Sequence, residues 1–474
     1  MNRTLIYIGF FFILAIVFAG CQSQSQQENS SLSVNNQINQ SINRADSNNN
    51  EESSSLLKLS EESTLSDYLR YAVLNNPGLE AAFNNFKAAL ERVPQAKSLP
   101  DPRFNYRYYI EQVETRVGAQ KQAFGISQMF PWFDKLKLRG NAALEAANAA
   151  KQRYEAVRLK LFYQVKDAYY EYYYLGRAIA IIQENMQLLE NFESVARIRY
   201  QVTTAEHPAI IHIQVELGKL EDRLRTLEDL QGPIVARLNA ALSRPVETTI
   251  PWPQSIEDKN ISLTDQQVID LMTQVNPELT ALEYDIARNK IEIDLAKKDY
   301  YPDITLGVDY IDTSDRIGAN PPKDNGQDPI IAMLSLNIPM WEEKLDASVR
   351  QRKYQYYAGL QSKKEKLNNL SSQLKLALYK YRDGQRKINL YQDTLLPKAI
   401  ESVKASETSF RAGDSSFLDL IDAQRVLLEF ELSNERALAD KAQRLAELEM
   451  LVGRDIFEME NLQSSENMSD NNKD

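Results

Sequence analysis

The chain of 474 residues contains one cysteine and two histidines. A single cysteine cannot form a disulfide within the chain. His207 and His212 lie five positions apart around Pro208, which does not place them on one helix face, so metal binding there is not expected. The sequence also lacks a phosphate-binding glycine loop, a dinucleotide fingerprint, a nucleophile elbow and a His-Glu-x-x-His motif. We therefore expect no catalytic residue, no metal site and no cofactor, and hence no enzyme.

An excess of positive charge is absent too. The 55 basic and 66 acidic residues give a formal net charge of -11. Binding to phosphates needs a concentrated basic surface, so a nucleic-acid partner is not expected. Apolar residues are sparse in two segments, residues 22–55 and the tail 456–474, which are rich in Ser, Asn and Gln. That composition predicts disordered segments.

The main apolar run, Leu5–Phe18, follows Asn2 and Arg3 and is too short for a comfortable membrane span. It is typical of a signal peptide, which we place at residues 1–20. Small residues then precede Cys21 and resemble a bacterial lipobox, which implies cleavage before Cys21 and a covalent lipid on it, with residues 21–60 as a flexible tether. The alternative is a buried thiol behind an uncleaved anchor. Gln22 is not the aspartate of an inner-membrane retention signal.

The remaining sequence is repeated. Asn76-Pro77-Gly78-Leu79 returns 200 residues later as Asn276-Pro277-Glu278-Leu279, and Leu238–Arg244 returns 210 residues later as Leu448–Arg454. An offset that is nearly constant indicates a tandem duplication. We assign the repeats to residues 61–245 and 263–455, joined by a linker at 246–262. Each is predicted to contain a helix, a strand pair, a long helix and a shorter helix.

Heptad spacing of apolar residues predicts the long helices. The pattern extends over about Trp132–Val202 and Trp341–Arg411, which at ~1.5 Å per residue corresponds to about 100 Å each. Breaks at Thr203–Pro208 and Gly413–Ser416 precede the return helices, predicted at about Ala209–Leu242 and Phe417–Leu451. Each repeat should therefore end in a helical hairpin. Pro397 lies inside the second long helix and predicts a kink.

Alternating residues predict the strand pairs at 102–131 and 302–339. Phe104, Tyr106, Tyr108 and Ile110 share one face of the first strand, and Ile304–Ile311 alternates in the same way. Segments of about ten such residues match transmembrane β-strands, although a soluble sheet with one wet face is the alternative. Four strands cannot close a barrel, and open edges in lipid are costly, so closure requires further copies. Three copies would supply twelve strands, although the sequence alone does not exclude two or four copies.

From Leu65 to Arg454 these features together resemble the TolC-type outer-membrane factors of efflux and type I secretion systems. The resemblance is carried by the doubled Asn-Pro-x-Leu, the strand-opening prolines, and the hairpin patterns Phe410–Gly413 and Phe417–Gln424. It implies a mainly α protein in which long antiparallel hairpins of a homotrimer form an α-barrel, joined to a shared 12-stranded transmembrane β-barrel.

The resemblance also implies a location and partners. The lipid-anchored trimer would lie in the outer membrane of a Gram-negative bacterium, with its helical part in the periplasm. There it would meet a periplasmic adaptor protein and an inner-membrane pump. The segment Val215–Asp222 looks most like members that work with proton-driven, often metal-exporting, pumps.

In such channels the hairpins converge on a periplasmic gate where carboxylates form rings. Asp419 and Asp422 hold the matching positions, and threefold symmetry would gather six carboxylates, which attract cations. The alternative is two solvated aspartates beside a helix start. Phe410, Gly413 and Ser415 belong to the same region. The best-known gate is held closed by an aromatic hydroxyl and an arginine, where this chain has Phe410 and Ser415, so closure must rest on packing or on other residues.

The function that follows is a passive channel of a tripartite efflux system, which exports solutes or metal ions delivered by the pump. Two alternatives remain open at this point. A conduit for type I secretion of polypeptides has the same architecture. A periplasmic coiled-coil scaffold or adaptor without a pore also has long hairpins, but it would not need the two strand pairs.

Overall fold

The computed structural model describes residues 59–60, 63–202, 207–257, 259–412 and 414–457. The predicted signal peptide, Cys21, most of the linker that follows it, Gly413 and the tail from residue 458 lie outside these ranges. The chain divides into two units, Met1–Ser63 and Thr64–Asp474. The second unit contains the helices and strands described below.

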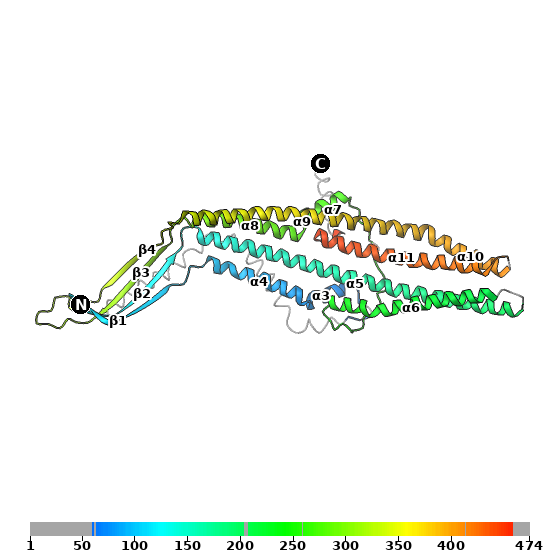
Figure 1. The fold of residues 1–474 in the computed structure, drawn as a ribbon, viewed down its shortest axis with the longest axis horizontal. Coiled ribbons are helices and arrows are strands. Elements are labelled where there is room, and N and C mark those ends of the chain that lie inside the picture. Colours follow the sequence, from blue (N-terminus) through cyan, green and yellow to red (C-terminus); the bar gives the residue numbers. More distant parts are fainter. Residues whose placement is uncertain (1–58, 61–62, 203–206, 258, 413, 458–474) are drawn as a thin grey trace, which may run out of the picture. The chain divides into compact units, whose positions relative to one another are not determined.

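Long helices dominate the second unit (Figure 1). They are α3 (Leu65–Asn75), α4 (Pro77–Lys97), α5 (Lys135–Val202), α6 (His207–Ala241), α7 (Asp265–Val275), α8 (Pro277–Lys298), α9 (Glu342–Leu390), the π-helical turn η1 (Tyr391–Leu395), α10 (Leu396–Ala412) and α11 (Phe417–Val452). The strands are β1 (Arg103–Thr115), β2 (Gly118–Phe130), β3 (Ile304–Thr313) and β4 (Ile330–Leu336). Within this unit the strands lie at one end of the helical layer and the hairpin turns at the other.

The repeated Asn-Pro pair divides what the sequence predicts as one helix into two. Asn276 ends α7 and also caps α8, where its side-chain oxygen accepts hydrogen bonds from Glu278 N at 2.9 Å and Leu279 N at 3.1 Å. Pro277 suits the first position of α8 because that position needs no N–H donor. The Asn276 amide also donates to the Leu451 carbonyl at 2.8 Å. The junction therefore ties the start of the repeat to its last helix.

The first repeat forms the same junction. Asn76 caps α4 by accepting from Leu79 N at 2.9 Å, and its amide donates to the Ala241 carbonyl at 3.4 Å. Ala241 and Leu451 lie at the ends of α6 and α11 and are 210 residues apart, which is the offset of the second repeated motif. The two motifs that reveal the duplication are thus in contact with each other in both halves.

Two apolar clusters hold the helices together. One joins α5, α6, α10 and α11 near the hairpin ends and includes Ile182, Leu220, Phe410 and Leu420. The other joins α7, α9 and α11 and includes Met272, Leu374, Leu448 and Ile456. Ile456, the first residue of the predicted tail, is fully buried there.

Pro397 lies just after η1. A proline cannot donate the N–H that would reach the carbonyl four residues earlier, at Asp393. The wider π-helical turn at Tyr391–Leu395 contains that carbonyl, so the predicted irregularity takes the form of a local change in helix type.

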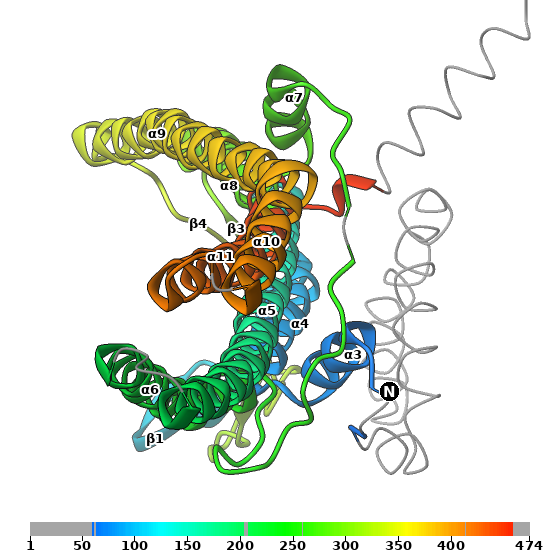
Figure 2. The ribbon, with the colours of Figure 1, turned by 90° about the vertical axis from the view of Figure 1, so that its right-hand side faces the viewer.

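The four strands form one antiparallel sheet in the order β1-β2-β3-β4. Beyond the sheet, α4 packs on α5, α5 on α8 and α8 on α9, so these helices form a row. Seen from the hairpin end, the helical layer is curved (Figure 2). The predicted combination of long helical hairpins with a short sheet is therefore present in a single chain.

Candidate functional site

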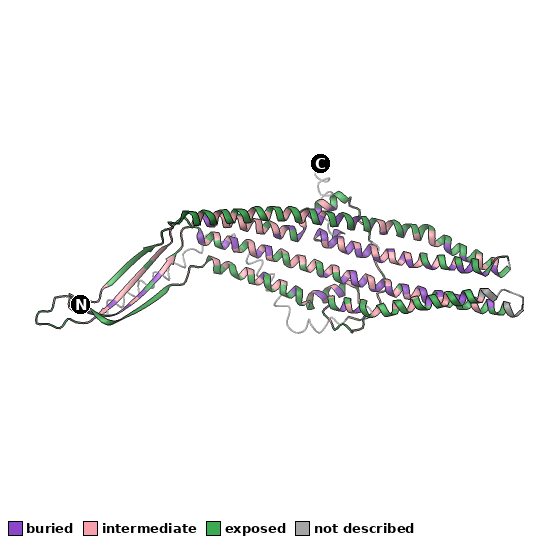
Figure 3. Ribbon diagram, viewed as in Figure 1, coloured by how far each residue is buried: buried purple, intermediate pink, exposed green. Residues whose placement is uncertain are grey.

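One face of the sheet is largely apolar and uncovered, although Gln122 and Gln128 of β2 also lie on it. The strand register places side chains from all four strands on this face, which we call the apolar sheet face: Phe104, Tyr106 and Tyr108 from β1, Phe124, Ile126 and Phe130 from β2, Ile304, Leu306, Val308 and Tyr310 from β3, and Ile330, Ala332, Leu334 and Leu336 from β4. Phe104 is 67% exposed and Leu334 is 66% exposed. Figure 3 shows β1 and β4 as exposed along their lengths. A contiguous apolar surface of this kind indicates contact with lipid or with another protein.

The opposite face carries small and polar residues on β1 and β2, together with Ile331 and Met333 of β4. Ala123, Gly125 and Ser127 of β2 are buried there. Arg107 on β1 and Asp309 on β3 form an ion pair across β2, with Nη2 and Oδ2 3.2 Å apart. A side chain at Gly125 would place its Cβ 2.0 Å from the Asp309 carboxylate, so glycine leaves room for this pair. The ion pair of Arg107 and Asp309 favours contact of this face with water, whereas the exposed Phe104 and Leu334 favour contact of the other face with lipid.

Both edge strands can pair with further strands. The described residues contribute four strands to the sheet, and β1 and β4 are the outer two. Each outer strand presents backbone N–H and C=O groups along its free edge, which is a template for pairing with another chain. β1 extends to Thr115, five residues past Ile110, where the predicted alternation ends, and its register with β2 is irregular between Tyr108 and Val113.

At the hairpin end, Asp419 is part of a helix cap. Ser416 is the N-cap of α11, and its hydroxyl accepts from Asp419 N at 3.3 Å. In return, the Asp419 carboxylate accepts from Ser416 N at 3.1 Å and Ser416 Oγ at 2.9 Å. This reciprocal capping box satisfies two donors at the helix start, so Asp419 has a structural role in addition to any role in a gate.

Asp422 belongs to a chain of charges that joins the two hairpins. Its Oδ1 lies 3.1 Å from Arg425 Nη1, and Arg425 Nη2 lies 2.8 Å from Glu216 Oε1 on α6. Burial alone would raise the pKa of Glu216, but hydrogen bonds from Lys219 and Arg425 outweigh it and hold that pKa below its ordinary value. Arg425 therefore bridges the hairpins, and Asp422 remains exposed beside it.

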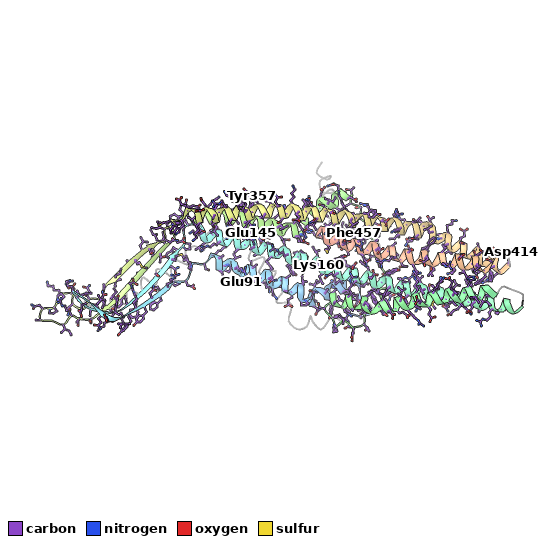
Figure 4. All side chains as sticks on the ribbon, in the orientation of Figure 1. Glu91, Glu145, Lys160, Tyr357, Asp414 and Phe457 are labelled. Carbon is purple, nitrogen blue, oxygen red and sulfur yellow. The ribbon has the colours of Figure 1, made fainter. Side chains whose placement is uncertain are left out.

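Phe410 packs into the hairpin core. Its ring lies 5.1 Å from that of Phe417 in an edge-to-face arrangement, and Phe417 contacts Phe192 of α5 at 6.4 Å. Ser415 Oγ is buried and has no hydrogen-bond partner. The structure thus brings Phe410, Ser415, Asp419 and Asp422 to one hairpin end, where Figure 4 also labels Asp414. Gly413 and the first hairpin's Thr203, Thr204 and Ala205 fall outside the described residues.

Sequence reasoning missed Glu216, Arg425 and the pair formed by Arg107 and Asp309. Opposite charges on separate segments signal a contact only when their register is known. Glu216 and Arg425 are 209 positions apart, and Arg107 and Asp309 are 202 apart. No local spacing in the sequence indicates either pair.

The described residues contain no group of three or more His, Cys, Asp or Glu side chains that could hold a metal ion. His212 is exposed on α6, and the His207 side chain is outside the part of the chain for which side chains are described.

Within the described ranges, no helix is both long enough and apolar enough to cross a membrane.

The chain matches the family model described as outer membrane efflux protein over residues 69–209 and 268–454. It is 21% identical over 409 residues to the cobalt-zinc-cadmium resistance protein CzcC of Cupriavidus metallidurans, covering 82% of this chain and 90% of that protein. It is also 21% identical over 409 residues to nodulation protein T of Rhizobium leguminosarum bv. trifolii, covering 82% of this chain and 85% of the relative.

Solved structures share the fold. The outer membrane protein VceC of Vibrio cholerae aligns with a TM-score of 0.67 at 15% identity, covering 83% of this chain and 96% of that one. CusC, whose structures concern transmembrane channel formation, aligns with a TM-score of 0.69 at 14% identity, covering 82% and 92%. The family model matches a segment in each repeat and more than half of the residues. The chain therefore belongs to the outer membrane efflux protein family.

Proposed function

We propose that this chain forms a trimeric channel in the outer membrane, anchored by a lipid on Cys21, which passively exports solutes or metal ions. An inner-membrane pump and a periplasmic adaptor protein would deliver the cargo to the hairpin end. The metal resistance named for CzcC supports metal ions as one cargo class.

The two-faced sheet is the observation that carries this proposal. An apolar face with Phe104 and Leu334 exposed is stable when lipid covers it, and the face with Arg107 and Asp309 is stable against water. Unpaired backbone groups cost several kcal/mol each in lipid, so the edges of β1 and β4 must pair with strands of other copies. Three copies with four strands each would close a barrel around a water-filled lumen.

Conductance tests the channel directly. Purified full-length protein should insert into planar lipid bilayers and give discrete conductance steps. A matched variant, Leu334→Arg, places a charge on the apolar sheet face and should sharply reduce the frequency of insertion, while Ser335→Arg on the opposite face should not. Absence of conductance from correctly folded wild-type oligomer would contradict the channel and favour a periplasmic scaffold.

The gate is proposed at Asp419 and Asp422. Asp422→Asn leaves the capping box of α11 intact and removes one carboxylate per chain. We expect weaker block of the current by a trivalent cation applied from the hairpin side. Glu365→Gln, at an exposed position on α9, is the control for loss of one negative charge. Equal block in Asp422→Asn and wild type would remove Asp422 from the gate.

A further inference from the structure

Four arginines line one cavity near the strands. The cavity has a volume of about 430 Å³ and is bordered by Arg92 of α4, Arg139 of α5, Arg288 of α8 and Arg352 of α9. Each of these residues lies within a few helical turns of a strand, so the cavity is close to the sheet. Figure 4 labels Glu91 and Glu145, which are sequence neighbours of cavity residues on α4 and α5. We call this site the arginine cavity.

Positive charge is in excess in the arginine cavity. Its acidic residues are Glu292 and Asp299. Glu292 is shared, because its carboxylate lies 2.7 Å from Arg352 Nη1 and 3.8 Å from Arg288 Nε. Asp299 lies 3.4 Å from Lys135 Nζ, a cation outside the cavity lining. Arg288 Nη1 also lies 3.2 Å from Asp285 Oδ1, an acid outside the cavity lining. These acids pair with Arg288 and Arg352 and, within the described part of the chain, leave the charges of Arg92 and Arg139 without an ion-pair partner.

Two of the guanidinium groups are available to a ligand. Among the described residues, Arg92 and Arg139 form no hydrogen bond and no ion pair, and both are exposed. Asp303 interacts with Arg139 through electrostatics alone. Arg288 Nε is buried and has no hydrogen-bond partner. A guanidinium presents several N–H donors in a planar fork that matches the oxygens of phosphate or carboxylate. Alanines from α4, α5 and α8 form much of the remaining wall and leave room for such a group.

The packing order indicates which side of the helical layer holds the cavity. The helices form the row α4-α5-α8-α9, in which α4 and α9 are the outer members. Figure 2 shows that this row is curved. On the concave side the outer helices α4 and α9 come closer together, so their side chains can line one cavity there. In the proposed trimer that concave side faces the lumen.

We infer that the arginine cavity is an anion-binding site on the inner wall of the channel, which takes dissolved solutes that bear a phosphate or carboxylate group. Its lumenal position rests on the proposed function. The duplication does not produce a second copy of this site, because the residue 200 positions after Arg92 is Glu292 and not an arginine. A trimer would have three such sites near the barrel, whereas Asp419 and Asp422 place negative charge at the hairpin end.

Inorganic pyrophosphate is a suitable probe. Added to wild-type channels in a planar bilayer, it should reduce the single-channel current in a saturable way. The double variant Arg92→Gln/Arg139→Gln removes the two guanidiniums that lack ion pairs and leaves the pairs with Glu292 intact. We expect it to need at least ~10-fold more pyrophosphate for the same block, consistent with the loss of charge-assisted hydrogen bonds.

Two further variants separate charge in the cavity from charge elsewhere. Arg350→Gln removes an exposed arginine two positions before Arg352, on the opposite side of α9 and outside the cavity lining, and should behave as wild type. Ser348→Asp adds a negative charge to the cavity wall and should weaken the block, while Ser348→Asn should not. These substitutions keep the test decisive if the double arginine variant does not fold.

The outcomes distinguish this inference from the proposed function. If wild type conducts but pyrophosphate has no effect, or blocks the cavity variants and wild type equally, the anion site is refuted and the channel stands. If wild type does not conduct, the channel is refuted. Calorimetric titration of pyrophosphate into detergent-solubilised protein then tests the anion site by itself. Binding to wild type that is lost in Ser348→Asp would support the site, and absence of binding to wild type would refute it.

Discussion

The sheet and the hairpin end are both amphipathic, but their apolar residues differ in how they are covered. At the hairpin end, apolar side chains of α5, α6, α10 and α11 bury one another, and Leu420 is fully covered within one chain. On the apolar sheet face, Ile330, Leu334 and Leu336 remain exposed. The apolar residues of the hairpin end are thus buried within one chain, whereas on the proposed function those of the sheet would be covered by lipid and the edges of the sheet by other copies.

The backbone repeats this contrast. Helices satisfy their own N–H and C=O groups, so the hairpin end can meet water or another protein without loss. The outer strands β1 and β4 each leave one row of backbone groups for a further partner. The two ends of one chain thus depend on different surroundings, and substitutions should affect them differently in water and in lipid.

The largest effect is expected in the hairpin core. Leu420→Ala would leave a cavity in the cluster of buried side chains and should lower the free energy of unfolding by about 2–5 kcal/mol. Leu418→Ala, two residues earlier and 44% exposed, is the control and should cost clearly less, about 0.5–1 kcal/mol. Urea denaturation followed by helical circular dichroism measures both. Equal losses would contradict an intramolecular hairpin core.

Next in size is a charge on the apolar sheet face. Leu334→Arg should destabilise the membrane-inserted protein by about 2–4 kcal/mol if the side chain lies near the bilayer midplane. Ser335→Arg, on the opposite face of the same strand, should cost less than about 0.5 kcal/mol. Unfolding from lipid vesicles in denaturant gives these values. A reversed order would mean that the two faces have been assigned the wrong way round.

The helix cap of α11 should contribute less. Ser416→Ala removes the hydroxyl of the capping box and should cost about 1 kcal/mol. Ser415→Ala provides a matched neighbour, because Ser415 Oγ is buried without a hydrogen bond and its removal should be neutral or slightly stabilising. Thermal denaturation of both variants at one pH tests the pair. Similar losses in the two variants would show that Ser416 does not act as the cap.

The smallest effect concerns pH. Burial, and then repulsion from Glu184, raises the pKa of Glu431 on α11 above its ordinary value. The folded state thus favours the protonated acid, and this stability is complete below the unfolded pKa and is lost as the pH rises through the folded pKa. Glu431→Gln should therefore have a higher melting temperature than wild type at pH 8 and an equal one at pH 4. Glu365→Gln is the control and should have the same melting temperature as wild type at both pH values. An equal melting temperature of Glu431→Gln and wild type at pH 8 would contradict a raised pKa of Glu431.

Sequence periodicity was sufficient for the long helices and the strand pairs. Heptad spacing and two-residue alternation are local signals, and they predicted α5 and the region of β3 closely. The division of each first helix at Asn76 and Asn276 was missed, although Asn followed by Pro is a recognisable cap signal. The contact of Asn276 with Leu451 could not be predicted, because it depends on how segments 175 residues apart pack.

The candidate gate was predictable only in outline. The motif places Asp419 and Asp422 at a hairpin end, but the capping role of Asp419 requires the geometry of Ser416. Arg425 was missed because its partner Glu216 lies on the other hairpin. The arginine cavity was missed for the same reason, since its charges come from four helices that are separate in sequence.

The dependence of the sheet on lipid and on other copies can be tested by native mass spectrometry of the full-length chain. In detergent micelles the protein should appear at three times the mass of one chain. On removal of detergent without lipid, the trimer should be lost to aggregation. A folded monomer that stays in solution without detergent, with its strands and helices intact, would contradict a sheet that is completed by other copies and covered by lipid.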